Sequence, residues 1–192
     1  GLARVPLTGG EPERVAGEHG PVFSLTSHNG RVYWSAHVGT GPDEILSLGP
    51  GETEPKLHYS YTRGIISLAV DDESIYWVEA VFEPLSSTVA RVGHDEDPSQ
   101  ARGLWRHDGF LLDHLRIGTD HLFLGYSAVE DVGKLFALGK GGGEAVLISE
   151  HPRVWSGMGG GNQVFAQVAI EDGTSSGRGL VRIETKRDAA EK

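Results

Sequence analysis

The stretch Val70-Asp71-Asp72-Glu73-Ser74-Ile75-Tyr76-Trp77-Val78 decides the fold of this chain. A short apolar segment ends at Val70, a polar turn follows, and a second apolar segment begins at Ile75. Asp and Ser accept tight-turn geometry and bond back to their own backbone, so this order predicts two strands joined by a turn. The residues from Ser74 to Val78 do not alternate between apolar and polar, which indicates that both faces of the second strand are buried.

The same hairpin is expected four times along the chain. Its second strand carries a short aromatic or apolar phrase, and successive copies start 43, 47 and 42 residues apart. Each copy follows a short segment of small and apolar residues and then a polar or glycine-rich turn. The four phrases are Val32-Tyr33-Trp34, Ile75-Tyr76-Trp77, Leu122-Phe123-Leu124 and Val164-Phe165-Ala166. A spacing this regular indicates a repeat protein.

A third strand is expected after each hairpin. A second phrase occurs five times, and its copies start 43, 44, 46 and 45 residues apart. After the first four copies come a turn and a weaker, more polar segment, which is expected to be an outer fourth strand that discourages pairing with other chains. The copies are Leu2-Ala3-Arg4-Val5, Ile45-Leu46-Ser47-Leu48, Val89-Ala90-Arg91-Val92, Leu135-Phe136-Ala137-Leu138 and Leu180-Val181-Arg182-Ile183. Four short strands in about 45 residues is the period of a β-propeller blade.

The fold class expected from these repeats is all-β, a β-propeller built of four-stranded blades, with about four blades present. Residues 1–183 are expected to form a single propeller domain, and residues 184–192 a charged C-terminal tail. Because the chain starts in the middle of a blade, two arrangements are open. A four-bladed ring would take the fourth strand of its last blade from residues 14–16 and leave residues 2–5 over. Alternatively the chain is part of a larger ring, since an open arc would expose long sheet edges.

The repeats resemble those of YWTD-type and related bacterial β-propellers. The resemblance rests on residues 70–78 and on Gly30-Arg31-Val32-Tyr33-Trp34-Ser35, where a turn leads into an aromatic second strand. It covers almost the whole chain, although the third and fourth copies of the phrase lack the Trp. The resemblance implies a blade architecture and a ring of six blades or more, and it implies no particular function.

The composition excludes several classes of protein. The 192 residues include no Cys, so disulfide frameworks, thiolate zinc sites and a cysteine nucleophile are excluded. The formal net charge of −10 argues against binding of nucleic acid, which relies on many cationic contacts. The longest uncharged apolar run, residues 65–70, is far shorter than the roughly 20 residues of a membrane span. Residue 1 is Gly, so we expect a mature or excised piece, and we favour an extracytoplasmic location.

A ligand site is expected at the mouth of the central channel. Propellers place ligands on the face built by the loops that enter the first strand and leave the second, an expectation that rests on analogy between folds. Mixed Arg, His, Glu and aromatic residues on those loops are typical of a polar small-molecule or peptide site. The candidates are His37, Arg63, Glu79, His114, Tyr126, Glu130, Arg153 and Trp155. By contrast, Trp34 and Trp77 belong to the second-strand phrases and are expected to be core wedges between blades.

The sequence contains no pattern typical of a metal site, a calcium loop, a phosphate-binding loop or a catalytic nucleophile. The nine His show no short ligand spacing, so no metal site is expected. The acidic turns at residues 71–72 and 95–97 lack the calcium-loop pattern and are expected to be solvated hairpin tips. The glycine runs at residues 141–143 and 159–161 are expected to be turns rather than phosphate cradles. No Gly-x-Ser-x-Gly elbow is present, so we expect neither a catalytic nucleophile nor a cofactor.

The function expected from the sequence is a non-catalytic binding or interaction module. Its ligand would be a polar small molecule, a glycan or a peptide, held at the channel mouth. The alternative is a propeller enzyme of the lactonase or lyase type, with acid and base residues in the central channel around Glu79, His114 and Glu130. A second chain that completes the ring is a further partner to consider.

Overall fold

The computed structural model of the chain describes residues 2–16, 20–37, 41–62, 64–126, 132–152, 154–160, 163–171 and 176–184, and from residue 151 onward the description is of the backbone alone. Within these residues lie seventeen β-strands and one turn of 3-10 helix, so the predicted all-β class is confirmed. No helix in this part of the chain is long and apolar enough to span a membrane. The chain divides into two compact units, Gly1–Leu111 (the first unit) and Leu112–Lys192 (the second unit).

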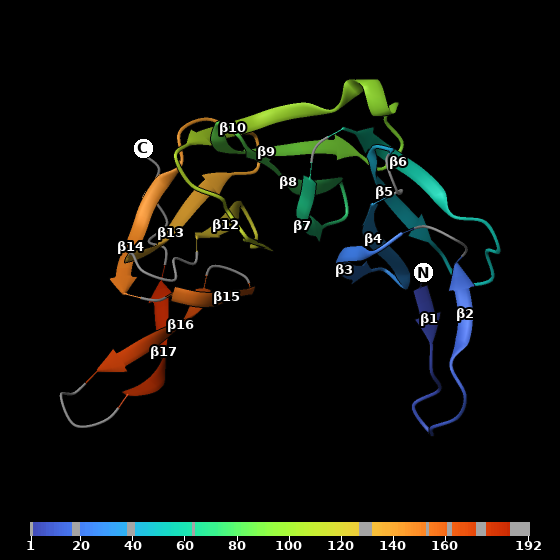
Figure 1. Cartoon of the computed structure of the whole chain (residues 1–192), viewed down its shortest axis with the longest axis horizontal. Helices are drawn as coiled ribbons and strands as arrows, with labels where there is room; N and C mark the ends of the chain where they lie inside the picture. The colour runs from blue at the N-terminus through green and yellow to red at the C-terminus, as the bar shows by residue number, and fades with distance from the viewer. Residues whose placement is uncertain are drawn as a thin grey trace, which may run out of the picture. The chain divides into compact units, whose positions relative to one another are not determined.

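The first unit holds three antiparallel sheets (Figure 1). Two of them are four-stranded meanders in which each strand pairs with the next one along the chain, and the third joins only two strands. The two-stranded sheet consists of β1 (Leu2–Arg4) and β2 (Glu13–Ala16). The first meander consists of β3 (Val22–His28), β4 (Arg31–His37), β5 (Asp43–Leu48) and β6 (Lys56–Tyr61). The second meander consists of β7 (Gly64–Val70), β8 (Ser74–Phe82), β9 (Leu85–Gly93) and β10 (Arg102–Asp108).

The second unit repeats this organisation with one four-stranded and one three-stranded sheet. The four-stranded meander consists of β11 (His114–Ile117), β12 (His121–Tyr126), β13 (Val132–Gly139) and β14 (Val146–Pro152). The three-stranded sheet consists of β15 (Val154–Gly160), β16 (Gln163–Glu171) and β17 (Ser176–Glu184). All four predicted hairpins are therefore confirmed, and the predicted third strand follows each of them.

Two hairpin turns of the first unit show how the sequence makes these strands reverse. Asn29 and Gly30 join β3 to β4 with φ angles of 47° and 76°, the left-handed backbone that the two-residue hairpin turn requires and that Asn and Gly tolerate best. Asp71 starts the turn between β7 and β8, where its Oδ1 accepts hydrogen bonds from the backbone N–H of Glu73 at 3.0 Å and of Ser74 at 2.9 Å. Local turn chemistry thus fixes the register of both meanders.

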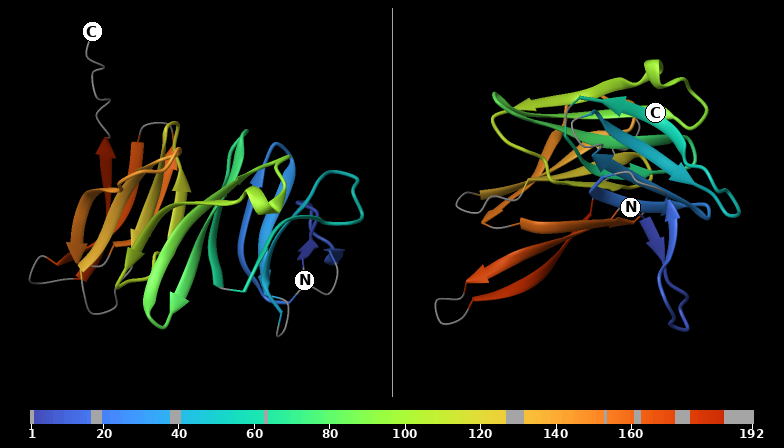
Figure 2. Two further views of the ribbon diagram at one scale, coloured as in Figure 1. Left: turned by 90° about the horizontal axis from the view of Figure 1, so that it is seen from above. Right: turned by 45° about the vertical axis from the view of Figure 1, so that its right-hand side comes forward.

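The two meanders of the first unit pack face to face (Figure 2). Contacts between β3, β4 and β7 join them, and a continuous apolar core fills the space between. Trp77 is fully buried in this core, and Trp34 is 1% exposed on the other face of the first meander. Their predicted role as wedges between sheets is confirmed. The buried residues of this core are Tyr33, Ile45, Ile65, Leu68, Val70, Ile75, Trp77, Ala90 and Val92.

The two-stranded sheet corrects one expectation from the sequence. Leu2 of β1 and Val15 pack against a cluster that contains Trp34 and Leu46, on the face of the first meander that points away from the second. Residues 2–4 pair with residues 13–16 to form this sheet, as expected of a third strand, a turn and a fourth strand, whereas the alternative that leaves residues 2–5 over is wrong. The physical reason is that Trp34 presents an apolar surface, which the strands of this hairpin cover.

The second and fourth strands differ in burial as the sequence predicts. All residues of β8 from Ser74 to Ala80 are buried, which fits a strand that is covered on both faces. In contrast, β6 exposes Lys56 and Ser60, and β10 exposes Arg102 and Arg106. Charged and polar side chains on an outer strand discourage its pairing with strands of other chains.

Candidate functional site

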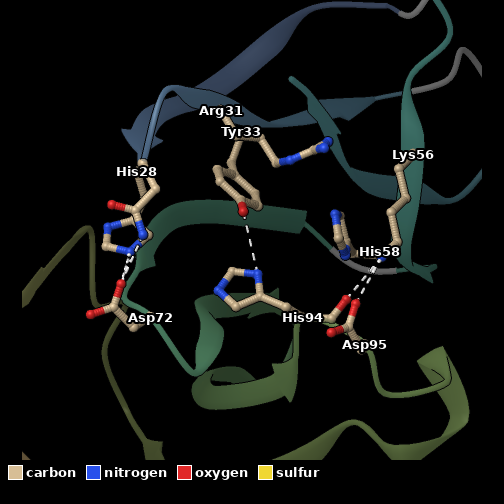
Figure 3. Close-up of a pocket in the computed structure, with 9 residues that line it drawn as sticks. His28, Arg31, Tyr33, Lys56, His58, Asp72, His94 and Asp95 are labelled. Carbon is tan, nitrogen blue, oxygen red and sulfur yellow. Dashed lines mark hydrogen bonds and ion pairs between the residues drawn. The ribbon is translucent and has the colours of Figure 1, made fainter. Parts of the chain in front are cut away.

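A cavity of about 340 Å³ lies between the two meanders of the first unit, at the end that carries the β3–β4 and β7–β8 turns (Figure 3). We call it the turn-end crevice. Its volume is at the small end of the range of ligand pockets. Its walls come from the β3–β4 hairpin, from β6 and from the turns that follow β7 and β9. The lining residues are His28, Asn29, Arg31, Tyr33, Lys56, His58, Asp72, His94 and Asp95.

Tyr33 lies at the centre of this wall and is only 4% exposed (Figure 3). Its hydroxyl lies 3.3 Å from Nδ1 of His94, and Nε2 of His94 lies 2.7 Å from the backbone carbonyl oxygen of Asp71. Because a carbonyl oxygen only accepts, we assign the proton to Nε2, so that in the neutral ring Nδ1 accepts from Tyr33. Burial raises the pKa of the Tyr33 phenol, which keeps this donor protonated.

The ring of Tyr33 contacts two imidazoles. Its centroid lies 5.8 Å from that of His58 and 5.7 Å from that of His94. Since β4, β6 and the turn after β9 carry these three residues, the ring contacts join the two meanders.

A carboxylate from the second meander is bound by the hairpin turn of the first. Oδ1 of Asp72 lies 2.8 Å from Nε2 of His28 and accepts a hydrogen bond of 2.8 Å from Nδ2 of Asn29. These bonds, that from His28 first, hold the pKa of the Asp72 carboxyl below its usual value, so the group is ionised near neutral pH. The Asp72 side chain is 80% exposed, and it therefore stays within reach of a ligand.

Arg31 forms a bidentate ion pair with Glu52. Its guanidinium donates to both carboxylate oxygens, one of them at 2.9 Å, and also donates to Oγ of Ser47 at 3.1 Å. The hydrogen bond to Glu52 raises the pKa of Arg31, and the bond from Arg31 lowers the pKa of Glu52. The charge of Arg31 is thus compensated inside its own meander.

His58 is a buried, neutral member of the crevice wall. It is 5% exposed, and its Nε2 lies 2.8 Å from Oγ of Ser47. Burial lowers the pKa of His58 to about 4, and the nearby cation of Lys56 adds to the effect. The ring is therefore uncharged at neutral pH and offers a polar but neutral surface.

Lys56 supplies the cation on the same side of the crevice (Figure 3). Its Nζ donates to the backbone carbonyl oxygen of His94 at 3.0 Å and lies 3.6 Å from Oδ1 of Asp95. As with Arg31 and Glu52, an anion accompanies this cation. The crevice wall is therefore rich in hydrogen-bonding groups while its charges compensate one another.

At the opposite end of the same two meanders, His37 contacts a buried carboxylate. Nδ1 of His37 lies 2.6 Å from Oδ1 of Asp43, and Oδ2 of Asp43 accepts a 2.8 Å hydrogen bond from the backbone N–H of Ile65. The Asp43 side chain is 5% exposed and that of His37 is 42% exposed. Because an ionised carboxylate only accepts, Nδ1 carries the proton, and Nε2 is the nitrogen directed away from the pair.

Glu79 is a second buried acceptor that joins the meanders. It is 8% exposed, and its Oε1 accepts hydrogen bonds from Nε1 of Trp77 at 2.9 Å and from the hydroxyl of Tyr59 at 3.0 Å. Burial, and then the charge of Glu79, raise the pKa of Tyr59. Both donors are thus satisfied by one carboxylate, an arrangement that stabilises the packing of Tyr59 on Trp77 at a ring distance of 4.4 Å.

The predicted ligand residues fall into three groups. His37 and Glu79 are bonded within the first unit as described above. His114 and Tyr126 lie on paired strands of the second unit, where His114 sits against Gly125; a Cβ at Gly125 would approach that of His114 to 3.2 Å. Arg63, Glu130 and Arg153 lie outside the described residues, and for Trp155 only the backbone is described. Convergence of the eight on one ligand stays a prediction.

The turn-end crevice contains none of these eight residues. Its members come from the turn end of the repeat, whereas the prediction used the loops at the other end. A signal was present in the sequence: His28, Asn29, Asp72, His94 and Asp95 all fall in the first or third turn of a repeat, and these turns lie at the same end of a meander. Within the part of the chain that the structure describes, no three His, Asp or Glu side chains gather as metal ligands would.

Comparison with known proteins shows the fold. No protein-family model and no curated protein matches the sequence. The computationally designed protein Ika4 is 14% identical, with a TM-score of 0.55 over 90% of this chain and 96% of its own. Ika8, also designed, is 14% identical, with a TM-score of 0.52 over 85% of this chain and 45% of its own, so this chain spans less than half of Ika8.

These likenesses make the chain an all-β β-propeller of about four blades. An α-L-arabinofuranosidase from Clostridium thermocellum is 10% identical, with a TM-score of 0.48 over 84% of this chain and 68% of its own, which is too remote to bear on substrate. One fold of this kind hosts many functions, so the fold does not say what the chain binds.

Proposed function

We propose that this chain is a non-catalytic β-propeller binding module that takes a polar small molecule, a glycan or a peptide in the turn-end crevice. The observation that supports the proposal is the crevice itself, a cavity of about 340 Å³ lined by polar side chains of two neighbouring blades. Concave sites of this size with several convergent polar groups are the usual place for a small ligand.

The walls of the crevice suit binding because they are pre-organised. Tyr33 and His58 are nearly buried and hydrogen bonded, and their strands belong to four-stranded sheets. Asp72 and Asn29 are bonded to each other across the two blades. A ligand would therefore meet groups that are already in place, which reduces the entropy cost of binding.

The proposal is tested by ligand-detected NMR on the full chain. The probes are maltotriose, myo-inositol, glycine, trialanine and inorganic phosphate. We expect at least one probe to bind the native chain and to lose binding when Asp72→Ala and Lys56→Ala are combined. Glu73→Ala is the matched control, because Glu73 is an exposed carboxylate in the same turn as Asp72 and does not line the crevice. Failure of all five probes, or equal binding by the double variant, would contradict the proposal.

An enzyme is the second candidate, and the His37–Asp43 pair favours it. A carboxylate that fixes one nitrogen of an imidazole leaves the other nitrogen as a base, the arrangement found in general acid–base catalysis. Hydrolysis of δ-valerolactone by the full chain tests this role. Turnover above the buffer rate that His37→Ala removes would support an enzyme, and turnover equal to that of buffer would exclude a lactonase of this kind.

A further inference from the structure

We infer that the turn-end crevice takes an uncharged ligand rich in hydroxyl groups, of the chemical class of sugars and cyclitols. This inference rests on the proposed function and narrows it to one of the ligand classes named there. It follows from three properties of the crevice wall: how its charges are compensated, which hydrogen-bonding capacity is left over, and how far the ring of Tyr33 is buried.

The charges of the wall leave little attraction for a net ionic ligand. Arg31 is paired with Glu52 in a bidentate contact, and Lys56 lies 3.6 Å from Asp95. The carboxylate of Asp72 lies on the side of the crevice away from Lys56 and accepts a hydrogen bond from Asn29 (Figure 3). An anionic ligand would meet Asp72 and Asp95, and a cationic one would meet Arg31 and Lys56. Either ion would therefore face repulsion as well as attraction inside the same small cavity.

The hydrogen-bonding capacity that is left over includes both donors and acceptors. Both bonds to Asp72 end on Oδ1, so Oδ2 of this exposed carboxylate can accept from a ligand. Asn29 uses one of its two amide hydrogens for Asp72 and can donate the other. Lys56 has three hydrogens, of which one goes to the carbonyl of His94 and one is directed toward Asp95.

A hydroxyl group matches this mixture because it donates and accepts at once. One hydroxyl can donate to Oδ2 of Asp72 while it accepts from Asn29, and a hydroxyl on the far side of the ligand can accept from Lys56, which lies at the opposite side of the crevice (Figure 3). Hydrogen bonds to charged groups are the stronger ones, so Asp72 and Lys56 carry most of the recognition. A ligand that bears hydroxyls on both sides can engage both walls without bringing a charge into the cavity.

The ring of Tyr33, the one tyrosine among the described residues that line the crevice, is nearly buried. Tyr33 is 4% exposed, and the imidazoles of His58 and His94 both contact its ring. An aromatic ligand would find little of the Tyr33 ring to stack on, and an apolar ligand would leave the polar groups of the wall without partners. Selectivity therefore comes from hydroxyl recognition rather than from stacking.

The test is a protein-detected NMR titration of the full chain labelled with ¹⁵N. The uncharged probes are D-glucose, D-galactose, L-arabinose, N-acetyl-D-glucosamine, trehalose and myo-inositol, and the charged probes are inorganic phosphate, glycine and putrescine. We expect at least one uncharged probe to shift the amide signals of Asn29, Asp72 and Asp95 in a saturable way. Asp72→Ala should weaken that probe at least tenfold, whereas Glu73→Ala should change its affinity less than twofold.

The outcomes separate this inference from the proposed function. If a charged probe shifts the crevice amides and no uncharged probe does, the hydroxyl-ligand inference is wrong while a binding crevice stands. If an uncharged probe shifts other amides only, or binds Asp72→Ala as tightly as the native chain, the inference is also wrong. If no probe of either kind shifts the crevice amides, both the inference and the proposed function fail.

Discussion

The two ends of the paired meanders in the first unit place their carboxylates in different surroundings. At one end, the side chain of Asp43 is 5% exposed and Glu79 is 8% exposed, and each accepts two hydrogen bonds, one of which comes from the neighbouring blade. At the turn end, the side chains of Asp72 and Asp95 are 80% and 99% exposed and border a cavity. The comparison teaches that a polar residue near a loop is a ligand candidate only when it is not already used to stabilise the fold.

Among the carboxylates compared, substitution of Glu79 should give the largest loss in the free energy of unfolding. Glu79→Ala leaves the buried Nε1–H of Trp77 and the hydroxyl of Tyr59 without an acceptor, so we expect a loss of roughly 3 to 4 kcal/mol in the free energy of unfolding. Glu79→Gln is the control, because its amide oxygen can still accept and the loss should be much smaller. Urea denaturation measures both. Equally small losses for Glu79→Ala and Glu79→Gln would mean that Glu79 does not stabilise the fold as a hydrogen-bond acceptor. Glu79 would then again be a candidate ligand residue.

Acid should destabilise the chain through His58. The unfolded ring binds a proton near its usual pKa of about 6.5, whereas the folded ring does so only near 4, so between these values the unfolded state binds more protons. The contribution of His58 to stability is complete above pH 7 and falls as the pH drops toward 4, by up to about 3 kcal/mol. Urea denaturation at successive pH values should show a shallower decline for His58→Gln, which cannot titrate. Identical pH profiles for the two chains would contradict the neutral, buried state of His58.

Removal of Asp43 should cost less than removal of Glu79. Asp43→Ala deprives the backbone N–H of Ile65 of its acceptor in the core, for which we expect a loss of about 2 kcal/mol in the free energy of unfolding. The matched variant His37→Ala removes only the partially exposed partner of the same carboxylate and should cost less than half as much. A larger loss for His37→Ala than for Asp43→Ala would contradict the role of Asp43 in the packing of the blades.

Asp72 should show the smallest effect on stability. Its carboxylate is exposed, and exposed ion pairs contribute little to folding, so Asp72→Ala should leave the thermal midpoint close to that of the native chain. Calorimetry of Asp72→Ala and Glu73→Ala checks this expectation. A drop in the midpoint for Asp72→Ala as large as that for Asp43→Ala would remove the contrast between the two ends.

The blades could be predicted from the sequence because their signals are local. The turn at Asp71 and the apolar run from Ile75 specify a hairpin within ten residues, and the repeat of this pattern specifies the sheets. The pairing of residues 2–4 with residues 13–16 follows the predicted order of third strand, turn and fourth strand, but the packing of this pair on the apolar face around Trp34 could not be predicted from that local pattern.

The candidate site could be predicted only in part. Mixed charged and aromatic residues occur in the loops at both ends of a blade, and the sequence does not say which of them are used up in buried hydrogen bonds. From the sequence, Glu79 is expected to be a carboxylate of the central channel. In the structure its Oε1 accepts a hydrogen bond from the hydroxyl of Tyr59, twenty residues away. The turn-end crevice depends on contacts such as His28 to Asp72, which lie forty-four residues apart and become visible only when the two blades are packed.

The most direct test of the crevice as the ligand site is a crystal structure of the full chain grown with the tightest-binding sugar of the panel. The account predicts electron density for the sugar between Asp72 and Lys56, with a hydroxyl group within hydrogen-bond distance of Oδ2 of Asp72. Density at the opposite end beside His37, with none between Asp72 and Lys56, would contradict it.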